Sequence, residues 1–129
     1  HPYLQQKGVV ALCEKEGILL QAYASLGGQD TKDGHWKALK QPALLDHPAV
    51  VKAAKAHSST SACVLLRWAL QKGWAVIPKS SSKTRIAANV AVAFSLSSDE
   101  MAALDALDLG GMTGRLCWRR DELRDLEFE

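Results

Sequence analysis

Two short apolar segments with a long helical stretch between them constrain the fold more than any other feature of the sequence. Residues 18–23 follow Gly17, and residues 75–77 end at Pro78, which cannot donate to a sheet ladder. Helical patterns fill most of the sequence between the two segments. Strands that are joined by a long helical crossover pair in parallel. The sequence therefore predicts an α/β fold in which helices cover two adjacent parallel strands.

Capping residues and glycines mark where the helices are expected to begin and end. The first expected helix covers residues 5–16 and ends at Gly17, and the second covers residues 48–54 and is capped by Asp46. A third runs from Ser59 or Thr60 to Gly73, and a fourth covers residues 84–92. The last begins with a capping box of Ser97 and Glu100 and ends at Gly110 and Gly111. Residues 27–41 lack any period and predict a long loop. We expect residues 112–129 to be irregular or partly helical.

The composition indicates one globular domain and argues against two classes of partner. The 129 residues are 47% hydrophobic and carry a formal net charge of +2. A charge this small does not favour nucleic acid or an anionic membrane as a partner. The apolar runs are also far shorter than the roughly 20 residues that span a bilayer. We therefore expect neither nucleic acid nor a membrane as a partner.

The cysteines and histidines predict a reducing environment without a metal site. Cys13, Cys63 and Cys117 are odd in number and form no CxxC pair, which favours free thiols and a cytoplasmic location. The four histidines lie far apart, so we expect no metal centre. The first residues, HPYLQQKG, do not resemble a signal peptide. Two parallel strands leave both sheet edges open, so we expect further strands from sequence outside this chain.

The segment from Ile77 to Asn89, IPKSSSKTRIAAN, carries the most specific chemistry. A strand ends there in Lys79 and three serines, a helix follows at once, and Arg85 and Asn89 lie one turn apart on the same side of that helix. Hydroxyls, amides and two cations at such a junction are typical of a phosphate-binding site. A solvated loop before a capped helix explains the same composition about equally well.

This segment resembles the signature of the aldo-keto reductases, in which the residues after the last barrel strand bind the adenosine 2′-phosphate of NADPH. Four further stretches resemble family landmarks in the family's order: HPYLQQ, GILLQAYASLG, VLLRWALQKG and FSLSSDEMAALDAL. The resemblance implies the last strands, helices and tail of a (β/α)8 TIM barrel. It divides the chain into the helix after the sixth strand (1–17), the seventh strand and its helices (18–73), the eighth strand with the cofactor-binding helix (74–93), and the last helix and tail (94–129).

The resemblance also assigns cofactor contacts residue by residue. It implies that Lys79 pairs with the 2′-phosphate, that Ser80 and Ser82 donate hydroxyls to it, that Arg85 stacks on adenine and reaches the same phosphate, and that Asn89 contacts adenine. Two cations on one phosphate would favour NADPH over NADH.

Two more residues and two departures complete the implied site. Tyr23 matches the aromatic residue that packs against the nicotinamide ring, although a tyrosine that closes a barrel core would look the same. The backbone of Leu26 matches a pyrophosphate contact. Ala24 stands where the family commonly has a serine, and Ala88 stands where it often has an acidic residue that reads adenine. The first departure removes a hydroxyl, and the second removes the adenine contact.

The implied function is that of an oxidoreductase that reduces aldehydes or ketones to alcohols with NADPH. The catalytic Asp, Tyr, Lys and His of the family come from earlier strands, and nothing in this chain matches their motifs. We therefore expect this chain to bind cofactor, to be inactive alone, and to belong to an enzyme that is monomeric at full length. The alternatives are a non-catalytic remnant that binds a nucleotide or a protein partner, and a phosphate-binding helical module unrelated to reductases.

Overall fold

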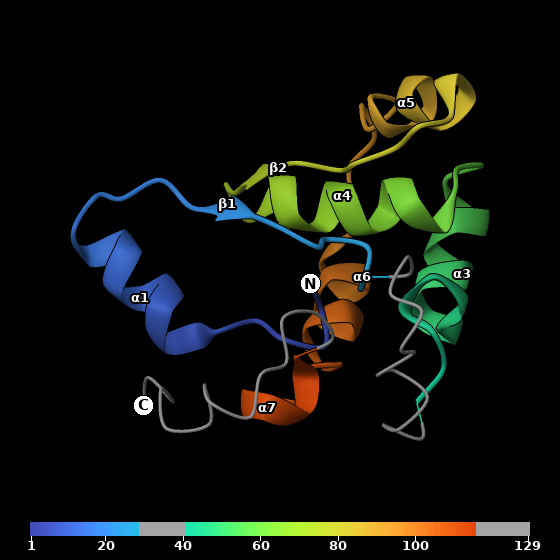
Figure 1. Ribbon diagram of the computed structural model, residues 1–129. Helices are drawn as coiled ribbons and strands as arrows, with labels where there is room; N and C mark the ends of the chain where they lie inside the picture. Colours follow the sequence, from blue (N-terminus) through green and yellow to red (C-terminus); the bar gives the residue numbers. More distant parts are fainter. Residues whose placement is uncertain (29–40, 116–129) are drawn as a thin grey trace.

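The computed structural model describes residues 1–28 and 41–115, and a pair of parallel strands lies at its centre (Figure 1). Strand β1 (Gln21–Ala22) pairs with β2 (Ala75–Val76), with Gln21 opposite Ala75 and Ala22 opposite Val76. This confirms the predicted α/β class and the predicted parallel pairing.

Both strands are shorter than expected, and the first is not the buried strand that its apolar run predicted. Ile18 is 57% exposed and Leu19 is 77% exposed, and neither belongs to β1. Among the described residues, β1 has one neighbouring strand, β2. The amide of Ala75 in β2 donates a hydrogen bond to the carbonyl of Leu20 at 2.9 Å. Without a second neighbour, the residues before Leu20 have no ladder to join.

The helices that lead into the strands end as predicted, at two glycines with left-handed backbone. Helix α1 (Lys7–Lys15) ends before Gly17, whose φ is 65°, and α4 (Ser61–Gln71) ends before Gly73, whose φ is 82°. After α1, the amides of Gly17 and Ile18 donate to carbonyls of the last turn, and Gly73 and Trp74 repeat this arrangement after α4. This paired geometry is the Schellman motif, which glycine adopts without a steric penalty.

The predicted cap of the next helix was wrong by one residue. Helix α3 (Pro48–Ala56) is capped by His47, whose Nδ1 accepts a hydrogen bond from the amide of Ala49 at 3.2 Å. Asp46 instead lies in a short 3₁₀ turn, η1 (Leu44–Asp46). Proline then occupies the first helical position, where its missing N–H costs nothing.

Both of the last helices end earlier than predicted. Helix α5 (Lys83–Asn89) begins one residue before the expected range of 84–92 and ends three residues short of it, and α6 (Ser98–Asp105) opens with the predicted capping box of Ser97 and Glu100. Helix α6 stops at Asp105 rather than at the glycines, because the following residues turn back and the amide of Leu109 donates to the carbonyl of Tyr3. Gly110 instead caps a short helix, α7 (Gly111–Gly114).

The expectations for the long loop and the tail mostly concern residues that lie outside the described part, namely 29–40 and 116–129. Cys117 is among them. In the residues that are described, every helix is too short or too polar to serve as a membrane span.

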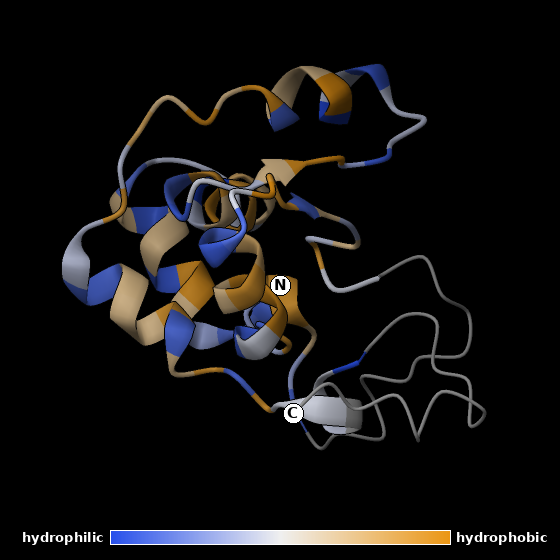
Figure 2. Cartoon of the chain, turned by 90° about the vertical axis from the view of Figure 1, so that its left-hand side faces the viewer, coloured by the Kyte–Doolittle hydropathy of each residue, from blue (hydrophilic) through white to orange (hydrophobic). Residues whose placement is uncertain are grey.

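The core is formed by helices and not by the sheet. Its fully buried side chains come from α3, α4, α6, η1 and the N-terminal segment: Tyr3, Leu44, Val50, Val64, Leu65, Trp68 and Leu104. Trp68 packs edge-on against the partly buried Trp74. By contrast, α1 and α5 bury none of their residues, and both views show α5 standing apart from the helical cluster (Figures 1 and 2).

A polar network joins the ends of α4 and α6 to the N-terminal segment. Asp105 accepts a hydrogen bond from Trp68 Nε1 at 2.8 Å and pairs with Lys72 Nζ at 2.9 Å. The ammonium of Lys72 also lies over the Trp68 and Trp74 rings. The side-chain amide of Gln5 donates to the Asp105 carbonyl at 2.7 Å. These contacts fix the N-terminal segment against α6.

A second polar contact joins α3 to α6 and makes stability depend on pH. Nε2 of His57 lies 3.0 Å and 3.1 Å from the two Glu100 carboxylate oxygens, and the His57 ring stacks on Phe94. The hydrogen bond from His57, followed by bonds from Ser97, holds the pKa of Glu100 below its usual range. A carboxylate with a lowered pKa stabilises the fold above its usual pKa and loses that contribution as the pH falls through the folded value.

We therefore expect Glu100→Gln to lower the free energy of unfolding by about 1 kcal/mol near neutral pH, because glutamine keeps the capping box and loses the charge-assisted bond to His57. The variant and the wild type should converge below about pH 4. Urea melts at several pH values measure this. Asp99→Asn removes the neighbouring acid of the same turn and should leave unchanged the slope of the unfolding free energy against pH in the acidic range. An equal change of this slope in both variants would contradict the assignment to Glu100.

Candidate functional site

The candidate site lies beyond the C-terminal ends of the two strands. Tyr23 follows β1 directly, and Lys79 lies just after the end of β2. Because the strands are parallel, both residues lie beyond the same end of the sheet, its C-terminal edge. This edge is where barrel enzymes place their sites.

A cavity of about 580 Å³ opens at this edge. Five of the seven predicted cofactor residues line it: Leu26, Lys79, Ser80, Arg85 and Asn89. They come from the turn after β1, the loop after β2, and α5. Residues that are far apart in the sequence therefore converge on one space large enough for part of a nucleotide.

Ser80 organises the cationic side of this cavity. Its hydroxyl oxygen accepts hydrogen bonds from the amide of Ser82 at 3.1 Å and from Nε of Arg85 at 3.3 Å. The guanidinium of Arg85 is thereby held toward the loop after β2. The hydroxyl proton of Ser80 can still be donated to a ligand oxygen.

Ser82 is one of the two predicted residues that do not line the cavity, and Tyr23 is the other. Its side-chain oxygen caps α5 by accepting from the amide of Arg85 at 3.4 Å. Ser81 lines the cavity in its place. The motif alone does not show which serine lines the cavity, because this depends on which serine caps α5.

The cavity is also lined by residues that sequence reasoning missed. Thr60 and Ala62, at the start of α4, are among them. The sequence marked Thr60 as a helix cap, and it does cap α4 by accepting from the amide of Cys63 at 3.1 Å. Nothing in the local pattern shows that this cap faces α5, since that proximity arises from packing.

The turn after β1 presents Leu26 to the cavity. Ala24 adopts a left-handed backbone with φ of 50°, and the amide of Gly27 donates to its carbonyl at 2.8 Å. The buried Ser25 closes the turn by donating to the carbonyl of Ala22 at 3.3 Å. A left-handed alanine is strained, and strain of this kind is concentrated near functional sites.

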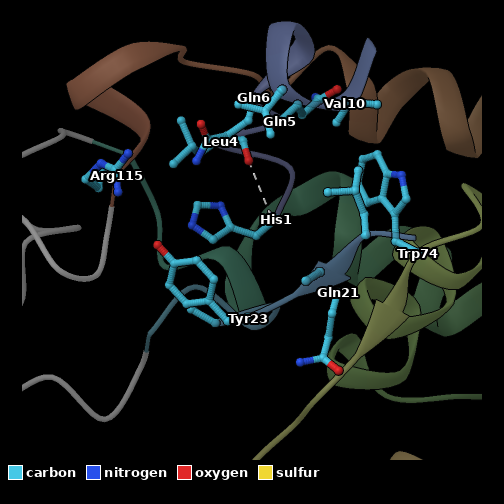
Figure 3. A pocket seen from close by; sticks show the side chains of 13 residues that line it. His1, Leu4, Gln5, Gln6, Val10, Gln21, Tyr23, Trp74 and Arg115 are labelled. Atoms are coloured by element: carbon cyan, nitrogen blue, oxygen red, sulfur yellow. Dashed lines mark hydrogen bonds between the residues drawn. The ribbon is translucent and has the colours of Figure 1, made fainter. Parts of the chain in front are cut away.

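Tyr23 lines a second, smaller cavity of about 220 Å³ between β1 and α1 (Figure 3). Figure 3 shows the rings of Tyr23 and His1 close together on one side and Trp74 on the other. Ala24 lines both cavities, so the two spaces are adjacent. Tyr23 is 45% exposed, which leaves its ring accessible in this chain.

The charges around the larger cavity favour an anion. The described residues that line it include Lys79 and Arg85 and no carboxylate. Within the described part of the chain, no three His, Cys, Asp or Glu residues come together in a group that could hold a metal ion. The cavity is therefore suited to a phosphate-bearing ligand.

A sequence model described as the Aldo/keto reductase family matches residues 1–109. The chain belongs to the aldo/keto reductase family. The matched range includes all seven predicted cofactor residues, from Tyr23 to Asn89.

Relatives in this family are similar over most of the chain. The "Probable NAD(P)H-dependent D-xylose reductase xyl1" of Arthroderma otae is 44% identical over 112 residues, which are 85% of this chain and 34% of the relative. The "NAD(P)H-dependent D-xylose reductase I,II" of Candida tropicalis is 40% identical over 85% of this chain and 35% of the relative. "Aldo-keto reductase family 1 member A1" of Cricetulus griseus is 39% identical over 84% of this chain and 33% of the relative. The chain thus spans about a third of the length of these relatives.

Proposed function

We propose that this chain is the C-terminal, cofactor-binding part of an aldo-keto reductase that reduces aldehydes or ketones to alcohols with NADPH. The observation that carries the proposal is the convergence of Leu26, Lys79, Ser80, Arg85 and Asn89 on one cavity. Membership of the family and the NAD(P)H dependence that the relatives' names state support it.

The proposal places the chain in a (β/α)8 barrel as its seventh and eighth strands with their helices. Residues 1–17 would follow the sixth strand, residues 18–73 and 74–93 would supply the last two strands and their helices, and residues 94–129 would form the final helix and tail. The parallel pair β1 and β2, with α4 between them in the chain, supports this order. The remaining strands would lie on the open edges of the pair.

The residues present fit the phosphate end of NADPH. Lys79 and Arg85 would hold the 2′-phosphate through charge-assisted hydrogen bonds, with hydroxyls from Ser80 and Ser82. Asn89 would contact adenine, and the turn at Leu26 would approach the pyrophosphate. Because NADH lacks the 2′-phosphate, these two cations would select NADPH.

The chain contributes binding and orientation rather than proton transfer. When it is bound, the cofactor supplies the hydride that reduces a carbonyl carbon. The exposed ring of Tyr23 would pack against the nicotinamide and fix which face of it meets the substrate. The acid that protonates the developing alkoxide would come from the earlier strands of the barrel.

The proposal is tested with the nucleotide portion of the cofactor that this chain alone would contact. Adenosine 2′,5′-bisphosphate carries adenine and the 2′-phosphate, and adenosine 5′-monophosphate lacks that phosphate. We expect calorimetric titration of the 129-residue chain to give at least about tenfold tighter binding of the bisphosphate at low salt, because each charge-assisted bond contributes about 1.5 to 3 kcal/mol. Equal affinities, or no binding of either compound, would contradict the proposal.

A further inference from the structure

One face of α4 carries a row of polar side chains that reach across to α5 and the segment after it. Thr60, Cys63, Arg67 and Gln71 are spaced by three or four residues, so they lie above one another on this face. We call these four residues the α4 stripe. Three of them, Cys63, Arg67 and Gln71, bond to residues between Ala88 and Leu96.

Cys63 joins the stripe to the C-terminal turn of α5. Its buried thiol donates to the carbonyl of Ala88 at 3.2 Å, and its sulfur accepts from the hydroxyl of Thr60 at 3.1 Å. Ala88 directly precedes Asn89, and Arg85 lies one turn earlier in the same helix. Both predicted adenosine contacts therefore belong to the helix that this thiol binds.

Arg67 and Gln71 fix the segment that follows α5. The guanidinium of Arg67 donates to the carbonyl of Val92 at 3.4 Å and to the hydroxyl of Ser95 at 3.1 Å. Gln71 bonds to both backbone groups of Leu96, at 2.9 Å and 3.0 Å, and accepts from Nε of Arg67 at 3.3 Å. The exit from α5 is thus bonded over several residues to α4.

These bonds matter because α5 has little else to hold it. It buries none of its residues, Ile86 is 51% exposed, and Val90 just after it is 78% exposed. Figure 1 shows α5 above α4, at a distance from α3 and α6. A helix of this length has little stability of its own in water, so its position depends on the contacts at its ends.

We propose that the α4 stripe is a positioning element that sets the affinity for the 2′-phosphorylated adenosine by holding α5 so that Arg85 and Asn89 face the cavity. This inference rests on the proposed function. The physical reason is preorganisation: a helix already held in place loses less conformational entropy when a ligand binds to it. Cys63 and Arg67 do not line the cavity themselves, so they would act through α5.

The test measures both the order of α5 and the affinity of the nucleotide. In the nucleotide-free chain, Cys63→Ala and Arg67→Ala should speed hydrogen exchange of the amides of residues 83–89 at short times and leave those of α3 unchanged. The dissociation constant of adenosine 2′,5′-bisphosphate should rise about five- to tenfold in each variant, the equivalent of losing one hydrogen bond. Cys63→Ser keeps a donor for the Ala88 carbonyl and should restore both readouts.

Lys55→Ala is the matched control, because it removes an exposed cation from α3, away from the cavity. It should leave the exchange of α5 as it is and weaken binding by less than about twofold. If Arg67→Ala behaves like Lys55→Ala in both readouts, the positioning role is overturned while the proposed function stands. If the wild type binds no nucleotide, the proposed function fails and this inference falls with it. Arg67 is only half-buried, so its variant remains informative even if Cys63→Ala does not fold.

Discussion

Lys79→Met and Arg85→Ala should each weaken binding of adenosine 2′,5′-bisphosphate by about 10- to 50-fold and leave adenosine 5′-monophosphate within about threefold. Lys79 and Arg85 are the only charged side chains among the described residues that line the cavity, so each substitution would remove a proposed bond to the phosphate that no other lining cation could replace. Both side chains are exposed, which places the effect toward the lower end of the range for charge-assisted bonds.

The measurement is a calorimetric titration of each variant with the two nucleotides, repeated at raised salt. Lys83→Met is the matched control, because it removes a cation from the first turn of α5 without touching the lining of the cavity. In a whole reductase that contains this chain, the same two variants should weaken NADPH far more than NADH. Equal losses for both nucleotides would show that Lys79 and Arg85 do not read the 2′-phosphate.

Local rules predicted the parts of this fold in which the chain satisfies its own backbone. Gly17 and Gly73 end their helices because only a residue without a side chain takes left-handed backbone without cost, and Ser97 with Glu100 opens α6 because its side chains serve the free amides of the first turn. These features depend on a few consecutive residues, so they can be read directly from the sequence.

Two of the errors concern contacts between distant segments. The apolar run at Ile18 and Leu19 reads as a buried strand, yet burial needs a neighbour that the described residues do not supply. Helix α6 ends before its glycines because Leu109 bonds to Tyr3, near the other end of the sequence. No local pattern contains either fact.

The candidate site divides in the same way. The cationic wall of the cavity lies in one segment, so Lys79, Ser80 and Arg85 could be predicted from the motif. The wall at Thr60 and the thiol bond from Cys63 to Ala88 depend on how α4 packs against α5, and periodicity marks them only as helix residues. Motifs therefore identify the groups that would bind the ligand, and packing decides what holds those groups in place.

The second large effect concerns chemistry, since the chain by itself should not reduce carbonyl compounds. We expect no turnover above the buffer rate when the purified chain is mixed with NADPH and a reactive aldehyde. In the proposed barrel, the acid that would protonate the alkoxide comes from the earlier strands and not from this chain. A general acid contributes about 10² to 10⁴-fold to the rate. Loss of the cofactor contacts from the remaining barrel would lower the rate further.

Stability should reflect the same open architecture. Ile18, Leu19 and Ile77 are more than half exposed beside the two strands, where further strands of a barrel would cover them. We expect a low urea midpoint and binding of a hydrophobic dye, with the helical core around Trp68 as the last part to unfold. Nucleotide binding by the same sample is the control that the chain is folded when it is assayed.

Joining the preceding part of the barrel to this chain would show whether the chain belongs to an enzyme or is a non-catalytic remnant. If the preceding reading frame encodes the catalytic Asp, Tyr, Lys and His of the family, joining it to this chain should restore reduction of the aldehyde and raise the urea midpoint together, because both depend on covering the open edges of β1 and β2. A chain that binds nucleotide but gains neither from that segment would be a remnant with a binding role. Turnover by the 129 residues alone, at a rate comparable to that of a whole reductase, would show that catalysis does not depend on the remaining barrel.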